Sequence, residues 1–107
     1  MSEYTGTGIS GGVFSGIVKV VHTDLDAKAL TKEHVAVLTA PQREHLHLLK
    51  RAGAIVSEGG GLLGHIAKLT REDNTPFVGN IADAANLFKN GERITVDGTR
   101  GVITCES

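Results

Sequence analysis

Few residues in this chain reveal a function by themselves. Its 107 residues include one cysteine, one methionine, two prolines and no tryptophan, and aromatic residues make up only 4%. A single cysteine, Cys105, forms neither an internal disulfide nor a cysteine-based metal site, which favours a reducing compartment. With so few aromatic side chains for bases to stack on, single-stranded nucleic acid is an unlikely class of ligand.

Charge and hydropathy exclude further classes. The formal net charge is -1, and no cluster of lysine or arginine indicates a nucleic-acid or membrane-surface partner. No apolar run approaches the roughly 18 residues that a membrane helix needs. The first ten residues also lack the apolar core of a signal peptide. We therefore expect a cytoplasmic protein whose residues 1–107 form one domain.

Glycine, in contrast, is abundant. The chain has 14 glycines, nearly twice the usual share of about 7%. They gather in residues 6–16, 53–64 and 91–101, separated by ordinary sequence, so they do not form a low-complexity linker. Glycines grouped in this way indicate tight turns and close backbone approach.

The hydrophobic pattern predicts an α/β domain. Strands are expected at 17–21, 35–39, 53–56, 77–79, 94–96 and 101–104, and about three helices at 41–52, 66–74 and 83–88. Residues 6–16 resemble a Gly/Ser-rich loop, and residues 23–33 a loop with at most one helical turn. Asp97-Gly98-Thr99-Arg100 is typical of a hairpin. Alternating strands and helices followed by this hairpin predict a compact fold with a mixed sheet.

The most informative segment joins the strand at 53–56 to the next helix. It reads Ser57-Glu58-Gly59-Gly60-Gly61-Leu62-Leu63-Gly64-His65. A helix that begins near residue 65 would direct its free N–H groups and positive dipole end into this turn, which is a favourable site for phosphate. A nucleophilic imidazole at that position suggests a histidine that is itself phosphorylated.

Three other interpretations of this segment compete with a phosphorylated histidine. Gly59-x-Gly61-x-x-Gly64 matches a dinucleotide fingerprint, but the acid expected about 20 residues later is absent from the end of the next strand. A Walker A loop requires Gly-Lys-Ser or Gly-Lys-Thr, and Gly64-His65 does not supply it. In the third, His65 only caps a helix and the glycines only form a turn.

Several spaced motifs together resemble one family. They are Gly8-Ile9-Ser10-Gly11-Gly12-Val13, Gly60-Gly61-Leu62-Leu63-Gly64-His65-Ile66-Ala67, Arg71-Glu72 with Thr75-Pro76-Phe77-Val78-Gly79, and Val96-Asp97-Gly98-Thr99-Arg100-Gly101-Val102. In this order they resemble the swivelling phosphohistidine domain of PEP-utilising enzymes, such as PEP synthase, pyruvate phosphate dikinase, enzyme I and rifampin phosphotransferase. The resemblance implies a single swivelling domain with β/β/α layers.

The resemblance also implies a mechanism. His65 would take a phosphoryl group from PEP or ATP, and the domain would then swing to a second active site and pass it on. Backbone N–H groups of Gly59, Gly60, Gly61 and Gly64 would hold the phosphoryl oxygens. Arg71 would either stabilise the charge or form a structural ion pair. No permanently bound cofactor or metal is expected, since Mg²⁺ would be supplied at the partner's active site.

A chain of this length is too short to be a complete dikinase. An ATP-binding module and a PEP-binding barrel each need more residues than the whole chain has. We therefore expect a carrier component of a phosphotransferase that works with separate ATP-binding or PEP-binding kinase subunits, or a fragment of a longer enzyme. The initial Met1 slightly favours the stand-alone carrier.

The sequence departs from the family pattern at four positions. Gly64 replaces a serine beside the histidine, Leu63 replaces a threonine that some dikinases phosphorylate for regulation, Gly11 replaces a proline, and Lys68 replaces an apolar residue. These changes motivate a competing hypothesis, a binding or regulatory module that kept the fold and lost phosphotransfer. A third hypothesis is non-covalent binding of a nucleotide or phosphate metabolite at residues 59–65.

The remaining histidines and the cysteine receive structural interpretations. His45 and His47 are two residues apart on a predicted helix, so they face different directions and do not suit a shared metal. We expect both to face solvent. His22 and His34 lie in or beside loops, and no neighbouring residue would lower the pKa of the Cys105 thiol.

Overall fold

One mixed β-sheet organises the structure, a computed structural model that describes residues 2–39, 43–59 and 62–105. Its eight strands within these residues are β1 (Ser2–Thr5), β2 (Thr7–Ser10), β3 (Val13–Val21), β4 (His34–Leu38), β5 (Ala54–Ser57), β6 (Phe77–Gly79), β7 (Arg93–Asp97) and β8 (Val102–Cys105). The helices are α1 (Asp24–Lys28), α2 (Leu46–Leu49), α3 (Leu63–Glu72) and α4 (Ala84–Leu87), with a 3₁₀ turn, η1 (Arg43–His45), before α2. The fold is therefore α/β with a mixed sheet, as the sequence predicts.

The two edges of the sheet belong to one short segment. The strand order is β1-β8-β7-β3-β4-β5-β6-β2, and the strands from β3 to β6 run parallel. Since β1 and β2 are separated by Gly6 alone, the chain passes from one edge to the other, and the Gly6 N–H donates to the Gly101 carbonyl over 2.8 Å. A Cβ on Gly98 would lie 1.8 Å from the Ser10 carbonyl oxygen. The hairpin between β7 and β8 therefore requires glycine where it passes the end of β2.

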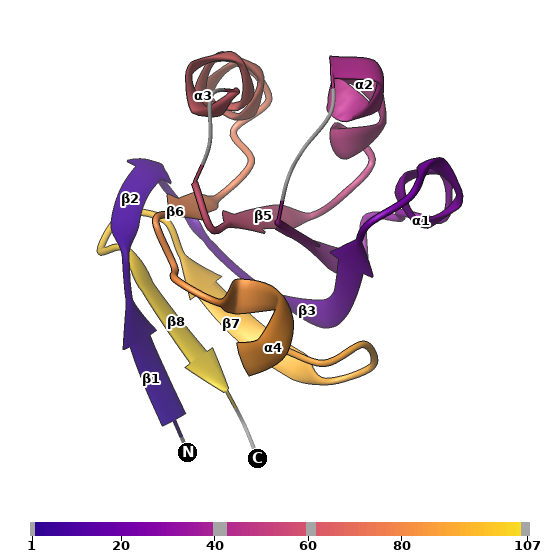
Figure 1. The fold of residues 1–107 in the computed structure, drawn as a ribbon. Coiled ribbons are helices and arrows are strands. Elements are labelled where there is room, and N and C mark those ends of the chain that lie inside the picture. The colour runs from indigo at the N-terminus through magenta and orange to yellow at the C-terminus, as the bar shows by residue number, and fades with distance from the viewer. Residues whose placement is uncertain (1, 40–42, 60–61, 106–107) are drawn as a thin grey trace.

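The central strands bury both faces. Along β4, the side chains of Val35 and Val37 join one hydrophobic cluster, and those of Ala36 and Leu38 join another. This alternation follows the two-residue period of a strand, and burial on both sides explains why β4 is apolar without interruption. Helices α1, α2 and α3 cover one face, while α4, β7 and β8 lie on the other side (Figure 1). The layers are thus helix, sheet and sheet.

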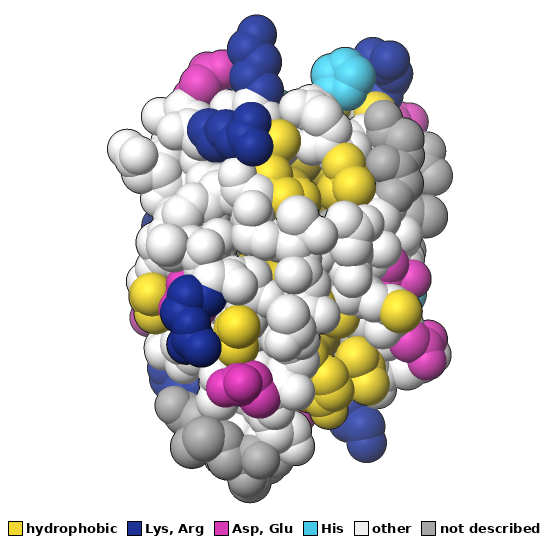
Figure 2. Space-filling view, turned by 90° about the vertical axis from the view of Figure 1, so that its left-hand side faces the viewer, with side chains coloured by type: hydrophobic (Ala, Val, Ile, Leu, Met, Phe, Trp, Pro, Cys, Tyr) yellow, Lys and Arg dark blue, Asp and Glu magenta, His cyan; other side chains and the backbone are white. Residues whose placement is uncertain are grey.

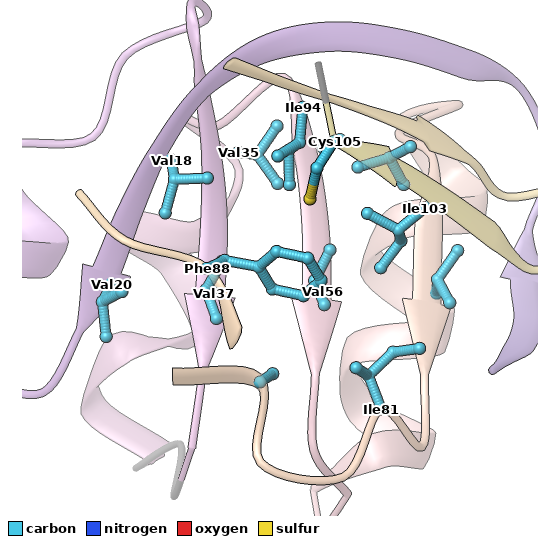
Figure 3. Packing of buried hydrophobic residues seen from close by; sticks show 14 residues of the cluster. Val18, Val20, Val35, Val37, Val56, Ile81, Phe88, Ile94, Ile103 and Cys105 are labelled. Atoms are coloured by element: carbon cyan, nitrogen blue, oxygen red, sulfur yellow. The ribbon is translucent and has the colours of Figure 1, made fainter. Parts of the chain in front are cut away.

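Phe88 lies in the middle of the hydrophobic cluster that contains Val35 and Val37, between strands β3 to β5 on one side and β7 and β8 on the other (Figure 3). It follows α4 and is fully buried. Figure 3 shows its ring among valines of β3, β4 and β5 on one side and Ile94, Ile103 and Cys105 on the other. The ring of Tyr4 meets Phe88 edge to face, with centroids 5.3 Å apart. This packing attaches β1 to the core.

The structure differs from three expectations about secondary structure. Residues 6–16 are not a loop, because β2 and the start of β3 occupy most of them, and β1 precedes them. These strands are polar and rich in glycine, so they are specified by pairing with β6 and β8 rather than by local pattern. The third helix begins at Leu63, earlier than residue 66. In place of the single helix predicted at 41–52, the described residues form η1 followed by α2, and Pro41 lies outside the described residues.

The beginning of α4 also differs from the expectation in its details. Asp83, the first residue of the predicted helix, instead lies immediately before α4. It has a φ of +63°, and its side chain caps no backbone N–H. The cap comes from Glu58, whose carboxylate accepts from the Ala85 N–H over 3.2 Å. No helix among the described residues is long and apolar enough to cross a membrane.

Candidate functional site

The connection between β5 and α3 begins with a tightly bonded turn. Ser57, at the end of β5, is fully buried, and its hydroxyl accepts from the Gly59 N–H over 3.2 Å. The Glu58 N–H donates to the Leu38 carbonyl of the neighbouring strand over 3.1 Å. Gly59 has a φ of +143°, a conformation that side chains disfavour. Glycine is therefore required at residue 59, while Gly60 and Gly61 lie outside the described residues.

The N-terminus of α3 has no side-chain cap. Leu62 occupies the cap position and accepts no capping hydrogen bond, and the first turn contains no acidic residue. The first hydrogen bond of the helix runs from the Ile66 N–H to the Leu62 carbonyl over 3.0 Å. The N–H groups of Leu63, Gly64 and His65 therefore have no intrahelical partner. Together with the helix dipole, they make this end attractive to an anion.

His65 lies in this first turn and is exposed. Figure 2 shows histidine, hydrophobic and basic side chains on the surface at the end of the molecule that carries the helices. The residue after His65, Ile66, is fully buried and packs against the sheet, which fixes the rotation of the helix. The fold thus presents the His65 imidazole outward, beside N–H groups that have no partner within the helix.

Gly64 is not required by crowding. A Cβ added at this residue would meet no atom of the described structure within 4 Å, and its φ is not positive. A serine would therefore fit at residue 64. The absence of a hydroxyl beside His65 is a feature of this sequence and is not imposed by the fold.

Arg71 is placed away from His65. Its Nε donates to the Ile9 carbonyl over 3.0 Å, which ties α3 to the edge strand β2. Six residues at about 100° each put it about 120° around the helix from His65. Of the predicted site residues, the structure brings Gly59, Gly64 and His65 to the same connection, whereas Arg71 takes the structural contact.

Sequence reasoning missed Asn80, which supports the turn from the neighbouring strand. Asn80 follows β6 with a φ of +59°, and its Nδ2 donates to the Thr7 hydroxyl over 3.1 Å. Its Oδ1 lies 3.6 Å from where a Cβ of Gly59 would be. The only signal in the sequence was an asparagine directly after a short strand, a residue type that tolerates the left-handed conformation. Its partner, 73 residues away, could not be recognised from sequence.

The expectation that His45 faces solvent is wrong. His45 is 5% exposed, and its Nε2 lies 2.6 Å from Asp24 Oδ1. Since residues 43–45 form a 3₁₀ turn rather than an α-helix, the ring is directed toward α1. His47 is exposed, as predicted. The described residues contain no group of three potential metal-ligating side chains.

Cys105 is a poor nucleophile in this fold. It is buried in the cluster around Phe88. Burial raises the pKa of its thiol, and the nearby charge of Glu92 adds to this shift. The thiolate is therefore disfavoured near neutral pH, in agreement with its predicted structural role.

Comparison with known proteins identifies the family. Residues 30–101 match the sequence model of the family described as the mobile domain of PEP-utilising enzymes. This chain belongs to that family. It is 39% identical over 99 residues to the phosphoenolpyruvate synthase of Aeropyrum pernix, covering 92% of this chain and 12% of that enzyme. It is 34% identical over 98 residues to a probable phosphoenolpyruvate synthase of Archaeoglobus fulgidus, covering 92% and 13%. The chain thus spans about an eighth of the length of these relatives.

Solved structures share the fold. Aconitase X of Thermococcus kodakaraensis superposes with a TM-score of 0.75 at 17% identity, over all of both chains. A solution structure of Enzyme I superposes with a TM-score of 0.67 at 21% identity, over 75% of this chain and 33% of that one. At such low identities these likenesses establish the architecture only.

Proposed function

We propose that this protein carries a phosphoryl group on His65. The observation that supports this most is the exposed imidazole in the first turn of an uncapped helix, directly after a glycine turn. Membership of the family of PEP-utilising mobile domains supports the same chemistry. A carrier histidine must be reachable by another active site, and the exposure of His65 meets that need.

The transfer is a displacement at phosphorus. The unprotonated ring nitrogen of neutral His65 attacks phosphorus of PEP or ATP, the P–O bond to the donor breaks, and its electron pair leaves with the donor oxygen. The phosphorylated ring then loses the proton on its other nitrogen. In the second step an acceptor oxygen attacks phosphorus and the N–P electron pair returns to the ring. The acceptor hydroxyl loses its proton and the ring regains one, so neutral His65 forms again.

The glycine turn and helix end hold the transferred group. The N–H groups of Gly64 and His65, with the dipole of α3, favour the phosphoryl charge. We assign the same role to Gly60 and Gly61. Gly59 shapes the turn instead, because its N–H donates to the Ser57 hydroxyl. Arg71 is held to β2, so we assign it to positioning α3 rather than to the phosphoryl group.

Donor and acceptor sites lie on separate ATP-binding or PEP-binding domains or subunits in this proposal. The chain spans only 12% and 13% of two relatives. The first turn of α3 contains no carboxylate that would hold Mg²⁺, so we place that ion with the partner. The helix layer would present His65 to each partner site in turn as the domain moves.

Gly64 favours a second candidate, a binding module that has lost phosphotransfer. Here the domain would bind its partner without accepting a phosphoryl group. The two candidates differ in one outcome. Substitution of His65 by alanine abolishes covalent labelling of a carrier, whereas a binding module keeps its affinity for the partner.

The test is an intact-mass measurement. The wild-type protein and His65→Ala are incubated with PEP or ATP in an extract of the host, and part of each sample is treated with acid. One acid-labile phosphoryl group on the wild type only supports the carrier. No mass change with either donor, in an extract that phosphorylates another carrier of this family, refutes it.

A further inference from the structure

Lys68 and His65 are neighbours on the surface of α3. They are three residues apart, and both are exposed. Side chains at this spacing lie on the same side of a helix, with Cβ atoms about 5–6 Å apart. Helical side chains also lean toward the N-terminus, so the Lys68 amine is directed toward His65.

The helix surface beside the two side chains is open at Gly64. Gly64 lies four residues before Lys68, on the same side of the helix, and a Cβ there would meet no described atom within 4 Å. A phosphoryl group on His65 would occupy this space. The Lys68 amine can therefore reach its oxygens without displacing another side chain.

The charges around Lys68 leave its amine available. Within residues 2–39, 43–59 and 62–105, the ion pairs within 4.0 Å are Lys19 with Asp26 and His45 with Asp24. The nearest acid along the helix is Glu72, one turn further from His65 than Lys68. In contrast, the Arg71 guanidinium is engaged by β2. Lys68 is thus the cation placed to contact the site.

We propose that Lys68 binds the phosphoryl group at His65, supplying the donor that a serine would offer at residue 64. The inference rests on the proposed carrier function, which makes His65 the phosphorylated residue. An ammonium group adds a charge-assisted hydrogen bond to a phosphoryl oxygen. It also lowers the energy of a dianionic group approaching the imidazole. The lysine therefore speeds phosphorylation and stabilises the product.

Phosphoramidate tests this without any partner protein. In this reaction the His65 nitrogen forms a bond to phosphorus, the P–N bond of phosphoramidate breaks, and its electron pair leaves with ammonia. The rate of labelling is followed at His65 by peptide mass spectrometry. His22, which is exposed and precedes α1, serves as the internal reference. The variants are Lys68→Met, Lys68→Arg and, as the matched control for losing one surface charge, Lys89→Met.

We expect Lys68→Met to lower the His65 rate, relative to His22, by about 1.4-fold to fivefold at low salt, the range for an exposed charge pair. Lys68→Arg retains most of the rate, and Lys89→Met changes nothing. The difference shrinks in about 1 M salt, because screening weakens exposed charge interactions. A merely structural role for Lys68 would show no such salt dependence.

Two results would overturn the proposal. One is an unchanged rate ratio in Lys68→Met, and the other is an equal loss in Lys89→Met, which would indicate a general charge effect. Because phosphoramidate needs no kinase, these results are independent of labelling in the host extract. A protein that phosphoramidate labels with help from Lys68, but that no extract labels, would contradict the carrier function alone.

Discussion

Replacing Gly64 by serine is expected to improve both the stability and the reactivity of the protein. Gly64 is the second residue of α3, and an added side chain there meets open space. Glycine is about 1 kcal/mol less favourable than alanine in a helix, and serine is intermediate. Gly64→Ser should therefore raise the free energy of unfolding by about 0.5 kcal/mol, which shifts the melting temperature by about 2–4 °C.

The effect on reactivity comes from the hydroxyl. A hydrogen bond to a charged group contributes roughly 1.5–3 kcal/mol, and exposure to water reduces this to about 1 kcal/mol. A stabilisation of about 1 kcal/mol corresponds to roughly fivefold in rate or equilibrium constant. We therefore expect Gly64→Ser to be phosphorylated on His65 about five times faster than the wild type.

Gly64→Ala is the matched control, since it gives the helix the same backbone restriction without a hydroxyl. Stability is measured by urea denaturation, with an unchanged slope as the check on two-state behaviour. Labelling is measured by intact mass in the host extract and with phosphoramidate. The reasoning is refuted if Gly64→Ser destabilises the fold, or if alanine speeds labelling as much as serine.

Three further predictions concern the fold. His45→Ala should lower the free energy of unfolding by about 2–3 kcal/mol, because a buried, hydrogen-bonded side chain is lost. His47→Ala should change that free energy little. Urea denaturation measures both variants, and equal effects would contradict the burial of His45. Gly98→Ala should lower the free energy of unfolding by about 3 kcal/mol or more, because the added Cβ would lie 1.8 Å from a backbone oxygen of β2. A thermal melt followed by circular dichroism that matches the wild type would contradict this close approach of the β7–β8 hairpin to β2. The pKa of Asp26 is lowered, chiefly by the hydrogen bond from the His22 N–H, so its stabilising contribution is present above the usual carboxyl pKa of about 3.9 and is lost as the pH falls through the lower folded value. The stability difference between the wild type and Asp26→Asn should accordingly shrink below about pH 4, and a difference that is constant from pH 7 to pH 3 would contradict the shift.

Sequence alone predicts the parts of the fold that depend on local pattern. The apolar runs of β4 and β5 are continuous because these strands are buried on both faces, so they are recognised without a partner. The glycine turn and the helix after it are equally local, which is why His65 is found from sequence. The structure places it in the first turn of α3, close to the expected position.

What sequence could not predict depends on partners distant along the chain. Strands β1 and β2 are polar and short, and pairing with β8 and β6 defines them. The Glu58 carboxylate caps α4 across 27 residues, and His45 is buried against Asp24 across 21 residues. None of these contacts has a periodic signature. The role of Arg71 belongs with them, because only the structure shows its bond to β2.

Carriage on His65 is tested most directly by a pulse and chase. The protein is labelled in host extract with PEP or ATP carrying a radioactive phosphoryl group, purified, and added to fresh extract that lacks labelled donor. The account predicts one phosphoryl group on His65 that leaves the protein faster in extract than in buffer and appears in an acceptor. It is contradicted if His65→Ala is labelled equally, or if the label leaves in extract no faster than it hydrolyses in buffer.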